Sequence, residues 1–493
     1  MKNINMKGAA WDSVFLTIVK FITIFTAILQ TKILSIGLSL TDYGTYSQAN
    51  IVVSISVSIL LLGLGDAINY YFNDSSGKYS KEQRIQIVNT IYTIELIAGI
   101  GLVCIVLFAR DLIAQYFSNE GLKIVVIIIS IKPMLDNMIY FYQILFVSTG
   151  KAKVIAIRNL VISILKVVSI FMAVHIFNSV IVIYISLILL DILQLIFFAI
   201  LFSKKNFAVL PFKCNFSLAK EIMKYGFPMG IFALTNALTR DIDKLIIGYM
   251  SNTETVAIYS NCSKVLPFDI IVLSFATVLI PYIMKYISQN QLESSILLFK
   301  NYLKIGYYTV WTFGVAVLVV TKQAISFLYS SEYLVGEPIF ILYVVDSMIK
   351  FASMHLILTA SGKAKLLMKY SAMSLGANAV LNIVFFKLFG IVGPAIATLV
   401  VTTGYTVSIL NKSTSILKAR WKDIVDIKDV LSFAFGLVMI AATFYVINKV
   451  LLLYKLNQYI VMVLVMGGFA TAILLVYRRR ISRILKTINS LKL

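Results

Sequence analysis

Long apolar runs recur from one end of this chain to the other, and they constrain its fold more than any other feature. The 493 residues are 60% hydrophobic and only 13% charged, which is far outside the composition of soluble globular proteins. A helix of about 20 apolar residues crosses the hydrocarbon core of a bilayer. Fourteen segments come near that length, at roughly 12–36, 46–68, 86–108, 122–147, 154–176, 180–202, 222–249, 257–287, 302–328, 338–360, 366–388, 391–411, 430–452 and 457–477. The sequence therefore predicts an all-α polytopic membrane protein with about fourteen transmembrane helices.

Lys and Arg residues are concentrated in alternate loops between these apolar segments. The chain has 44 Lys and Arg against 22 Asp and Glu, a net charge of +22. Loops rich in Lys or Arg stay on the cytoplasmic side of a membrane, and with an even number of crossings every basic loop falls on one side. The basic loops are 78–84, 151–158, 204–224, 285–304, 363–369 and 412–422, and both termini are also basic. We expect both termini in the cytoplasm, and we assign the charge to membrane topology and not to nucleic-acid binding.

Short sequences of the first half recur in the second half at nearly one offset. The turn TGKAK at 149–153 returns as SGKAK at 361–365, DNMIYF at 136–141 returns as DSMIKF at 346–351, and the Tyr-Ser pair at 46–47 returns at 259–260. Such a repeat predicts two parallel six-helix lobes around a pseudo-twofold axis, with a cavity between them. We place the N-terminal lobe at 1–205, the C-terminal lobe at 206–420, and two additional helices with a basic tail at 421–493.

Ionisable side chains fall inside several predicted helices, where facing lipid is costly. Helix 12–36 has a polar stripe that includes Lys20, and the repeat-related helix 222–249 has a stripe that includes Arg240. Because the stripe occurs in both halves, it favours a cationic cavity. The alternative is pairing between side chains, for example of Arg240 with Asp241 or Asp243.

Other charges extend this pattern. Lys166 lies too deep to reach the interface easily, and Arg158 lies nearer the cytoplasmic end of the same helix. Lys264 fits the cavity and the outer interface equally well. We interpret the repeated acids Asp136 and Asp346 as structural counter-ions. Cations exceed acids in the predicted cavity, which favours an anionic cargo. The candidate substrate-binding residues are Lys20, Arg158, Lys166, Arg240 and Lys264.

Oxygen-bearing side chains gather in two neighbouring helices of the second half. Asn378 and Asn382 are four residues apart on one face of helix 366–388, and Thr398 lies within reach if this helix and the next form a hairpin. With Asp243 they would offer the oxygen ligands that hard cations such as Na⁺ prefer. The alternative is hydrogen bonding between helices by the asparagines.

No sequence pattern of an active site accompanies these residues. The GKAK turns lack the G-x-x-x-x-G-K-[ST] sequence of a phosphate loop, and no strand precedes them. The longest polar stretch, about 203–225, is rich in Lys and too short to fold alone. We expect a membrane transporter and not an enzyme, with no cofactor apart from a coupling ion, Na⁺ or H⁺.

Several segments, in this order and spacing, resemble the polysaccharide repeat-unit flippases of the multidrug/oligosaccharidyl-lipid/polysaccharide exporter superfamily. They are 8–15, 32–47, 63–72, 225–230, 243–249, 257–260, 378–382 and 390–395. The resemblance implies fourteen helices in two lobes of six plus two. Related lipid II flippases bind a diphosphate with cavity arginines, and they hold Na⁺ at positions that correspond here to Asp243, Asn378, Asn382 and Thr398. Asn382 departs from that pattern, which has an acid there, and lysines 20, 166 and 264 would have to replace the arginines.

The function implied by the resemblance is the movement of undecaprenyl-diphosphate-linked oligosaccharide repeat units from the cytoplasmic to the outer leaflet of a bacterial cell membrane. Alternating access between the lobes would move the glycan, and a polysaccharide polymerase would use it outside. A cation-coupled multidrug antiporter of the same fold is the first alternative, but it calls for a more acidic and aromatic cavity. A membrane glycan polymerase or glycosyltransferase is the second, but it calls for a sizeable catalytic loop.

Overall fold

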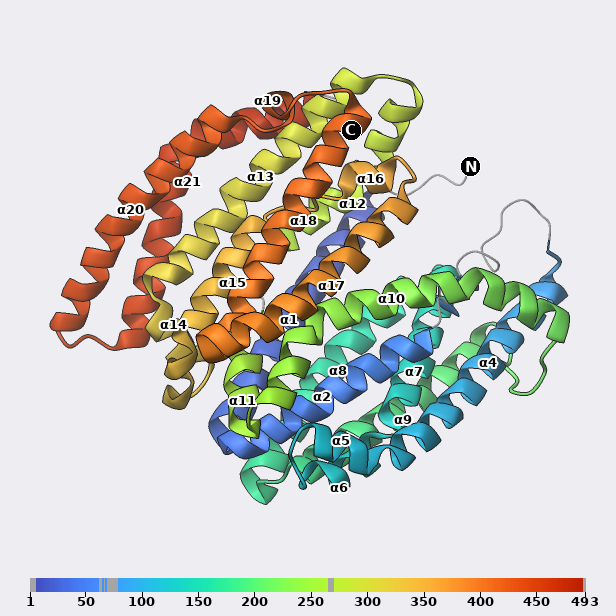
Figure 1. The fold of residues 1–493 in the computed structure, drawn as a ribbon. Coiled ribbons are helices and arrows are strands. Elements are labelled where there is room, and N and C mark those ends of the chain that lie inside the picture. The colour runs from blue at the N-terminus through green and yellow to red at the C-terminus, as the bar shows by residue number, and fades with distance from the viewer. Residues whose placement is uncertain (1–5, 62–63, 66, 69–78, 265–269, 491–493) are drawn as a thin grey trace. The chain divides into compact units, whose positions relative to one another are not determined.

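Helices account for nearly all of the structure, a computed structural model that describes residues 6–490 except 62–63, 66, 69–78 and 265–269 (Figure 1). The longer helices are α1 (Met6–Gly37), α2 (Leu40–Leu61), α4 (Lys81–Phe108), α6 (Leu122–Ile129), α7 (Lys132–Ser148), α8 (Ala152–Met172), α9 (Val180–Lys205), α10 (Phe216–Met250), α11 (Thr253–Cys262), α12 (Ile270–Ser288), α13 (Leu292–Val319), α14 (Thr321–Leu328), α15 (Glu337–Ile349), α17 (Ala364–Phe389), α18 (Gly393–Leu417), α20 (Ile427–Leu453) and α21 (Gln458–Ser490). Shorter elements are α5 (Arg110–Tyr116), η1 (Ala173–Phe177), η2 (Ser331–Gly336), α16 (Leu356–Ala360), η3 (Gly390–Val392) and α19 (Trp421–Ile424).

Every predicted transmembrane segment overlaps one or more of these helices, which confirms the all-α membrane fold. Among the described residues, ten stretches are long and apolar enough to cross a bilayer. One of them, Lys365–Leu417, contains both α17 and α18. The chain is therefore a multi-pass membrane protein.

Several predicted helices are broken where the sequence pattern indicated continuity, among them 302–328, which divides into α13 and α14 at Val320. Segment 122–147 divides into α6 and α7 at Ser130 and Ile131. Pro133, in the first turn of α7, has no N–H to donate to the carbonyl one turn earlier, so the hydrogen-bond ladder stops there. Segment 338–360 likewise divides into α15 and α16.

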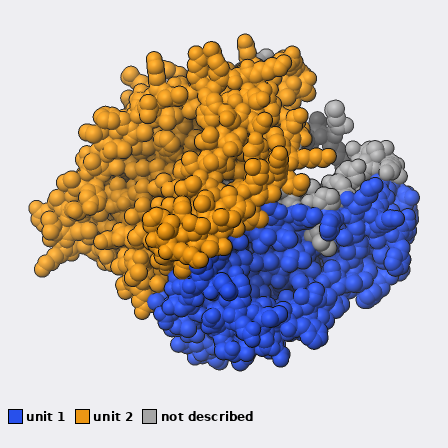
Figure 2. Space-filling view, viewed as in Figure 1, with its two compact units in different colours: residues 1–257 blue, residues 258–493 orange. Residues whose placement is uncertain are grey.

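The helices pack into two compact units, residues 1–257 and 258–493, which Figure 2 colours separately. Helix α10, which the repeat assigns to the second lobe, packs on α2 and α4 and belongs to unit 1. Units defined by packing need not follow a repeat. The lobes at 1–205 and 206–420 therefore stay a prediction.

The repeated GKAK sequence forms the same turn in both places. The amides of Gly150 and Lys151 donate to the carbonyls of Val147 and Phe146, and the equivalent amides of 362 and 363 donate to those of 359 and 358. This pattern is a Schellman C-cap, which needs a left-handed residue at the position of the glycine. Gly150 has φ of +73° and Gly362 has φ of +67°. The interpretation of both sequences as short turns is confirmed.

One contact joins two positions that are equivalent in the repeat. Thr41 Oγ1 at the start of α2 donates to Glu254 Oε1 at the start of α11, at 3.1 Å. These residues are 213 apart, which is also the offset between the Tyr-Ser pair at 46–47 and its copy. The contact therefore connects the beginnings of α2 and α11 within unit 1, at two positions that the sequence repeat relates.

Two carboxylates hold the C-terminal helices of unit 2 onto α13. Lys304 Nζ lies 2.9 Å from Asp426 Oδ2 at the start of α20, and this hydrogen bond lowers the pKa of the Asp426 carboxyl. Asp429, one turn later, accepts a hydrogen bond from Tyr307 and lies 3.1 Å from Arg480 of α21. Ion pairs thus connect α20 and α21 to α13, which also packs against them through aromatic side chains.

Candidate functional site

A cluster of charged side chains lies inside unit 1, where α7, α8 and α9 meet. Lys132 Nζ lies 2.7 Å from Asp191 Oδ2 and 3.1 Å from Asp136 Oδ1. Lys166 Nζ lies 3.7 Å from the other oxygen of Asp191, whose side chain is only 2% exposed. Gln194 Nε2 donates to Asp191 at 3.1 Å. Two carboxylates thus hold two ammonium groups within membrane-spanning helices.

The break between α6 and α7 places Lys132 in this cluster. Lys132 is the first residue of α7, inside the candidate span Leu122–Ser148. Sequence analysis missed Lys132, although the Lys-Pro pair inside an apolar run was a signal for it. Discontinuous transmembrane helices often carry polar sites, because the broken backbone and its charged side chains need partners.

Arg158 of α8 lies beside this cluster but forms no ion pair within the described part of the chain. Its guanidinium donates to Gln194 Oε1 and to Asn159 Oδ1, and it lies 5.4 Å from the ring centre of Phe198. Its ε N–H is buried and has no hydrogen-bond acceptor among the residues that the structure describes. With Arg158 the cluster has three cations, Lys132, Lys166 and Arg158, against the two acids.

Arg240 belongs to a second group of polar side chains, between α10 and α2. Its guanidinium lies 3.5 Å from Asp241 and donates to Ser54 Oγ at 2.8 Å. Lys244 Nζ lies 2.9 Å from the other oxygen of Asp241. The expected alternative, pairing of Arg240 with a neighbouring acid, is therefore confirmed. The Arg240 side chain is nevertheless 67% exposed, so it keeps most of its surface for a further anion.

The remaining predicted cations are exposed and lie in different units. Lys20 is exposed on α1 of unit 1. Lys264 of unit 2 is exposed and donates to Asn261 Oδ1 at 2.8 Å. The structure describes no side chain before Val19 and none for Asn236, so these parts of the two predicted stripes lie outside the described residues, whereas Thr23, Gln30, Thr239 and Asp243 are described.

The interpretation of the repeated acids as counter-ions is confirmed in both units. Asp136 pairs with the lysine four residues before it, and Asp346 pairs with Lys350, four residues after it, at 2.7 Å. Lys350 also lines a pocket of about 230 Å³ with His355, at the break between α15 and α16. The repeat thus preserves the acid and changes the side from which its lysine comes.

Three of the proposed sodium ligands are close together in unit 2. Helices α17 and α18 form the expected hairpin (Figure 1), and Thr398 Oγ1 lies 3.5 Å from Asn378 Oδ1. Asn382 is fully buried, and within the described residues neither its amide oxygen nor its amide nitrogen has a hydrogen-bond partner. Asp243 lies in unit 1, is 3% exposed and accepts a hydrogen bond from the Lys244 amide.

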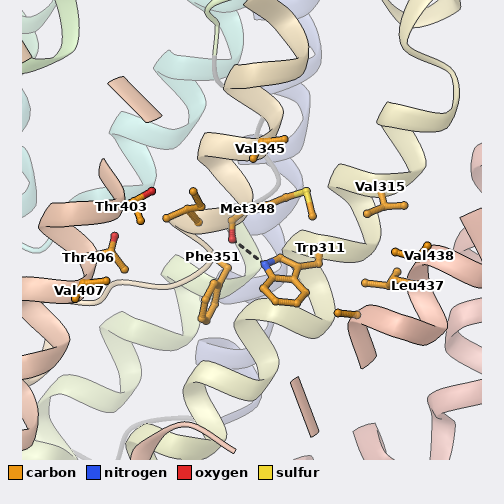
Figure 3. A pocket seen from close by; sticks show the side chains of 12 residues that line it. Trp311, Val315, Val345, Met348, Phe351, Thr403, Thr406, Val407, Leu437 and Val438 are labelled. Carbon is orange, nitrogen blue, oxygen red and sulfur yellow. Dashed lines mark hydrogen bonds between the residues drawn. The ribbon is translucent and has the colours of Figure 1, made fainter. Parts of the chain in front are cut away.

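The pocket shown in Figure 3 has a different character. It measures about 410 Å³, lies between α13, α15, α18 and α20, and has no ionisable side chain in its lining. Its indole donor, Trp311 Nε1, is already bonded to the Met348 carbonyl at 2.7 Å. This apolar cavity offers no charge to an anionic group.

Comparison with known proteins gives a family and a fold. The sequence family described as polysaccharide biosynthesis protein matches residues 33–337, and no curated protein sequence matches the chain. A solved structure of the lipid II flippase MurJ, in an inward closed conformation, superimposes with a TM-score of 0.72 at 14% identity, covering 95% of this chain and all of the other.

Two other solved structures share this fold at lower similarity. An inward-facing multidrug resistance transporter of the MATE family gives a TM-score of 0.68 at 12% identity, covering 80% of this chain and 94% of the other. A transporter of the MOP superfamily from Pyrococcus furiosus, described as having a binding pocket of reverse polarity, gives 0.58 at 14% identity and covers 83% and 95%. At such identities the likeness establishes the fold alone.

Proposed function

Because this chain belongs to the polysaccharide biosynthesis protein family, we propose that it is a flippase for undecaprenyl-diphosphate-linked oligosaccharide repeat units. It moves them from the cytoplasmic to the outer leaflet of a bacterial cell membrane, with both of its termini in the cytoplasm. Alternating access between two lobes carries the glycan across, and a polysaccharide polymerase uses it outside. The membrane fold shared with MurJ and MATE transporters supports this proposal.

The observation that carries the proposal is the surplus of cations on spanning helices of unit 1. Lys132, Lys166 and Arg158 face only two acids, and the exposed Arg240 shares Asp241 with Lys244. Charges within the membrane mark ion or substrate pathways, and an excess of positive charge favours an anion. A diphosphate fits this site better than the cationic drugs of a multidrug antiporter. A glycan polymerase or glycosyltransferase has no comparable support.

The packing of α1 against α8 indicates that Lys20 and Lys166 lie at different depths along the helices. Gln30 Nε2 contacts the Ser163 carbonyl, and Gly37 lies against Val174, so the two helices run parallel. Lys20 is then level with the beginning of α8, about 20 Å along the helix axis from Lys166 at 1.5 Å per residue. In the proposed mechanism Lys20 meets the diphosphate first and Lys166 receives it deeper in the membrane. Arg158 and Lys264 stay predictions as substrate ligands.

Replacing Arg240 with alanine should slow glycan transport about tenfold or more, because a charge-assisted hydrogen bond to phosphate contributes about 1.5–3 kcal/mol. Arg240→Lys should keep part of the activity. Arg110→Ala is the matched control, since Arg110 is 48% exposed and lies 3.7 Å from its neighbour Asp111. Transport of a lipid-linked oligosaccharide by the purified chain in vesicles is the measurement. Equal rates for Arg240→Ala and Arg110→Ala would contradict the role of Arg240.

We also propose that Na⁺ binds at Asn378, Asn382 and Thr398 of unit 2, whereas Asp243, the fourth predicted ligand, belongs to unit 1 and stays a prediction. The unpartnered amide of Asn382 fits this, because a buried polar group without a partner is costly and its oxygen is a ligand that Na⁺ prefers. Bound Na⁺ would supply the coupling energy of an ion gradient. The chain's part is to hold the α17–α18 hairpin in a shape that brings these oxygens together. Proton coupling is the alternative.

Sodium should raise the melting temperature of the purified protein relative to choline at equal ionic strength. Asn382→Leu should abolish this rise at little cost to stability, since the amide of Asn382 makes no hydrogen bond. Asn448→Leu is the control, because Asn448 of α20 is also buried but is bonded to Gln323. That variant should melt lower and still respond to sodium. A sodium response that survives Asn382→Leu would exclude this site.

A further inference from the structure

A groove of about 410 Å³ runs between α8 and α9 in unit 1. Its walls are apolar and largely exposed, with Ile157 and Val161 on α8 and Leu193 and Phe197 on α9 each about half exposed or more. Side chains of this kind on membrane-spanning helices face hydrocarbon and not water. The groove is therefore open to the lipid phase.

The groove has the length of one leaflet. Its lining on α8 extends from Val154 to Leu165, which are eleven positions apart, or about 16 Å at 1.5 Å per residue. The hydrocarbon core of a bilayer is about 30 Å thick, so each leaflet contributes about half of that. A single acyl chain fits along this length.

One end of the groove is strongly positive. Arg158 lines this end of the groove, one turn from Val154. The beginning of α8 and the end of α9 flank the same end, which we call the mouth, and they carry Lys151, Lys153, Lys204 and Lys205. No Asp or Glu occurs between 137 and 190 or between 192 and 220. The buried ε N–H of Arg158 has no acceptor in the described part of the chain, and the long arginine side chain can extend toward the membrane surface.

We propose that this groove binds an anionic glycerophospholipid of the surrounding bilayer, with an acyl chain along α8 and α9 and the phosphate at Arg158 and the lysines of the mouth. Basic pockets between transmembrane helices bind anionic headgroups in this way. The lipid phosphate completes the hydrogen bonds of Arg158, and through Gln194 it borders the Lys132–Asp191 cluster. The lipid site shares Arg158 with the cations on which the proposed glycan transport rests, but lipid binding can be measured without transport.

The test is a titration of the delipidated full-length protein with phosphatidylglycerol and with phosphatidylcholine of the same acyl chains, followed by native mass spectrometry. Arg158→Gln should weaken phosphatidylglycerol binding about tenfold and leave phosphatidylcholine binding unchanged. Arg158→Lys should restore part of the preference. Lys449→Gln, which removes an exposed cation of α20, is the charge control and should bind like the wild type.

A second variant tests the acyl chain while the charges stay in place. Leu193→Trp should fill the groove and weaken phosphatidylglycerol binding, whereas Leu464→Trp on α21, where the leucine is similarly exposed, should not. The proposal is overturned if Arg158→Gln binds phosphatidylglycerol as tightly as Lys449→Gln. It is also overturned if glycerol phosphate, which has no acyl chain, competes as well as the lipid. Preferred binding of a polyprenyl phosphate would equally overturn it.

Discussion

Replacing Asp191 with leucine should destabilise the protein by about 3 kcal/mol, because it removes one partner of a buried ion pair and leaves a buried ammonium group behind. Asp191 is the acid that both Lys132 and Lys166 approach, and its side chain is 2% exposed. The value lies at the lower end of the usual range of about 3–5 kcal/mol, because Asp136 still accepts from Lys132 at 3.1 Å. A drop in the melting temperature of the purified protein would show this loss.

Two further variants show whether the loss of stability comes from the buried charge or from introducing a leucine. Lys132→Met combined with Asp191→Leu should melt closer to the wild type than Asp191→Leu alone, since apolar replacement of a buried ion pair is often nearly neutral. Asp111→Leu is the control, because Asp111 is 55% exposed and its pairs with Arg110 and Lys123 are surface pairs, which contribute about 0–1 kcal/mol. If Asp191→Leu and Asp111→Leu had the same melting temperature, the charge cluster would not contribute to the stability of the protein.

Local sequence was enough to predict the helices and the repeated turns. An apolar run of bilayer length has one way to satisfy its backbone, which is to form a helix. The glycines at 150 and 362 each follow such a run and adopt the left-handed conformation that a Schellman cap needs. Ion pairs between sequence neighbours could be predicted for the same reason, since Arg240 and Asp241 are adjacent in the chain.

The charge cluster could not be predicted, because it depends on how separate helices are aligned. Lys132 and Asp191 are 59 residues apart and on different helices, and no periodicity within either helix fixes their relative depth. The sequence also could not predict that the buried amide of Asn382 has no hydrogen-bond partner among the described residues. Whether a buried polar group finds a partner depends on its neighbours and not on its own position along the helix.

Replacing Gly393 with alanine should destabilise the α17–α18 hairpin by about 1–3 kcal/mol, the range for overpacking a closely packed site. A Cβ at Gly393 would lie 2.0 Å from the Phe385 carbonyl oxygen and 2.2 Å from its carbon. These are backbone atoms inside α17, so no side-chain rotation relieves the clash. The two helices must separate at this end, as a lower melting temperature would show.

Gly404→Ala provides the control within the same helix. No atom lies within 4 Å of a Cβ at Gly404, and alanine in a helix interior is more stable than glycine by about 0.5–1 kcal/mol, so this variant should melt slightly higher than the wild type. The hairpin also brings Thr398 within 3.5 Å of Asn378. If sodium binds there, Gly393→Ala should reduce the sodium-dependent rise in melting temperature, and Gly404→Ala should preserve it. Equal melting of the two variants would mean that α17 and α18 do not approach as closely at Gly393 as the structure places them.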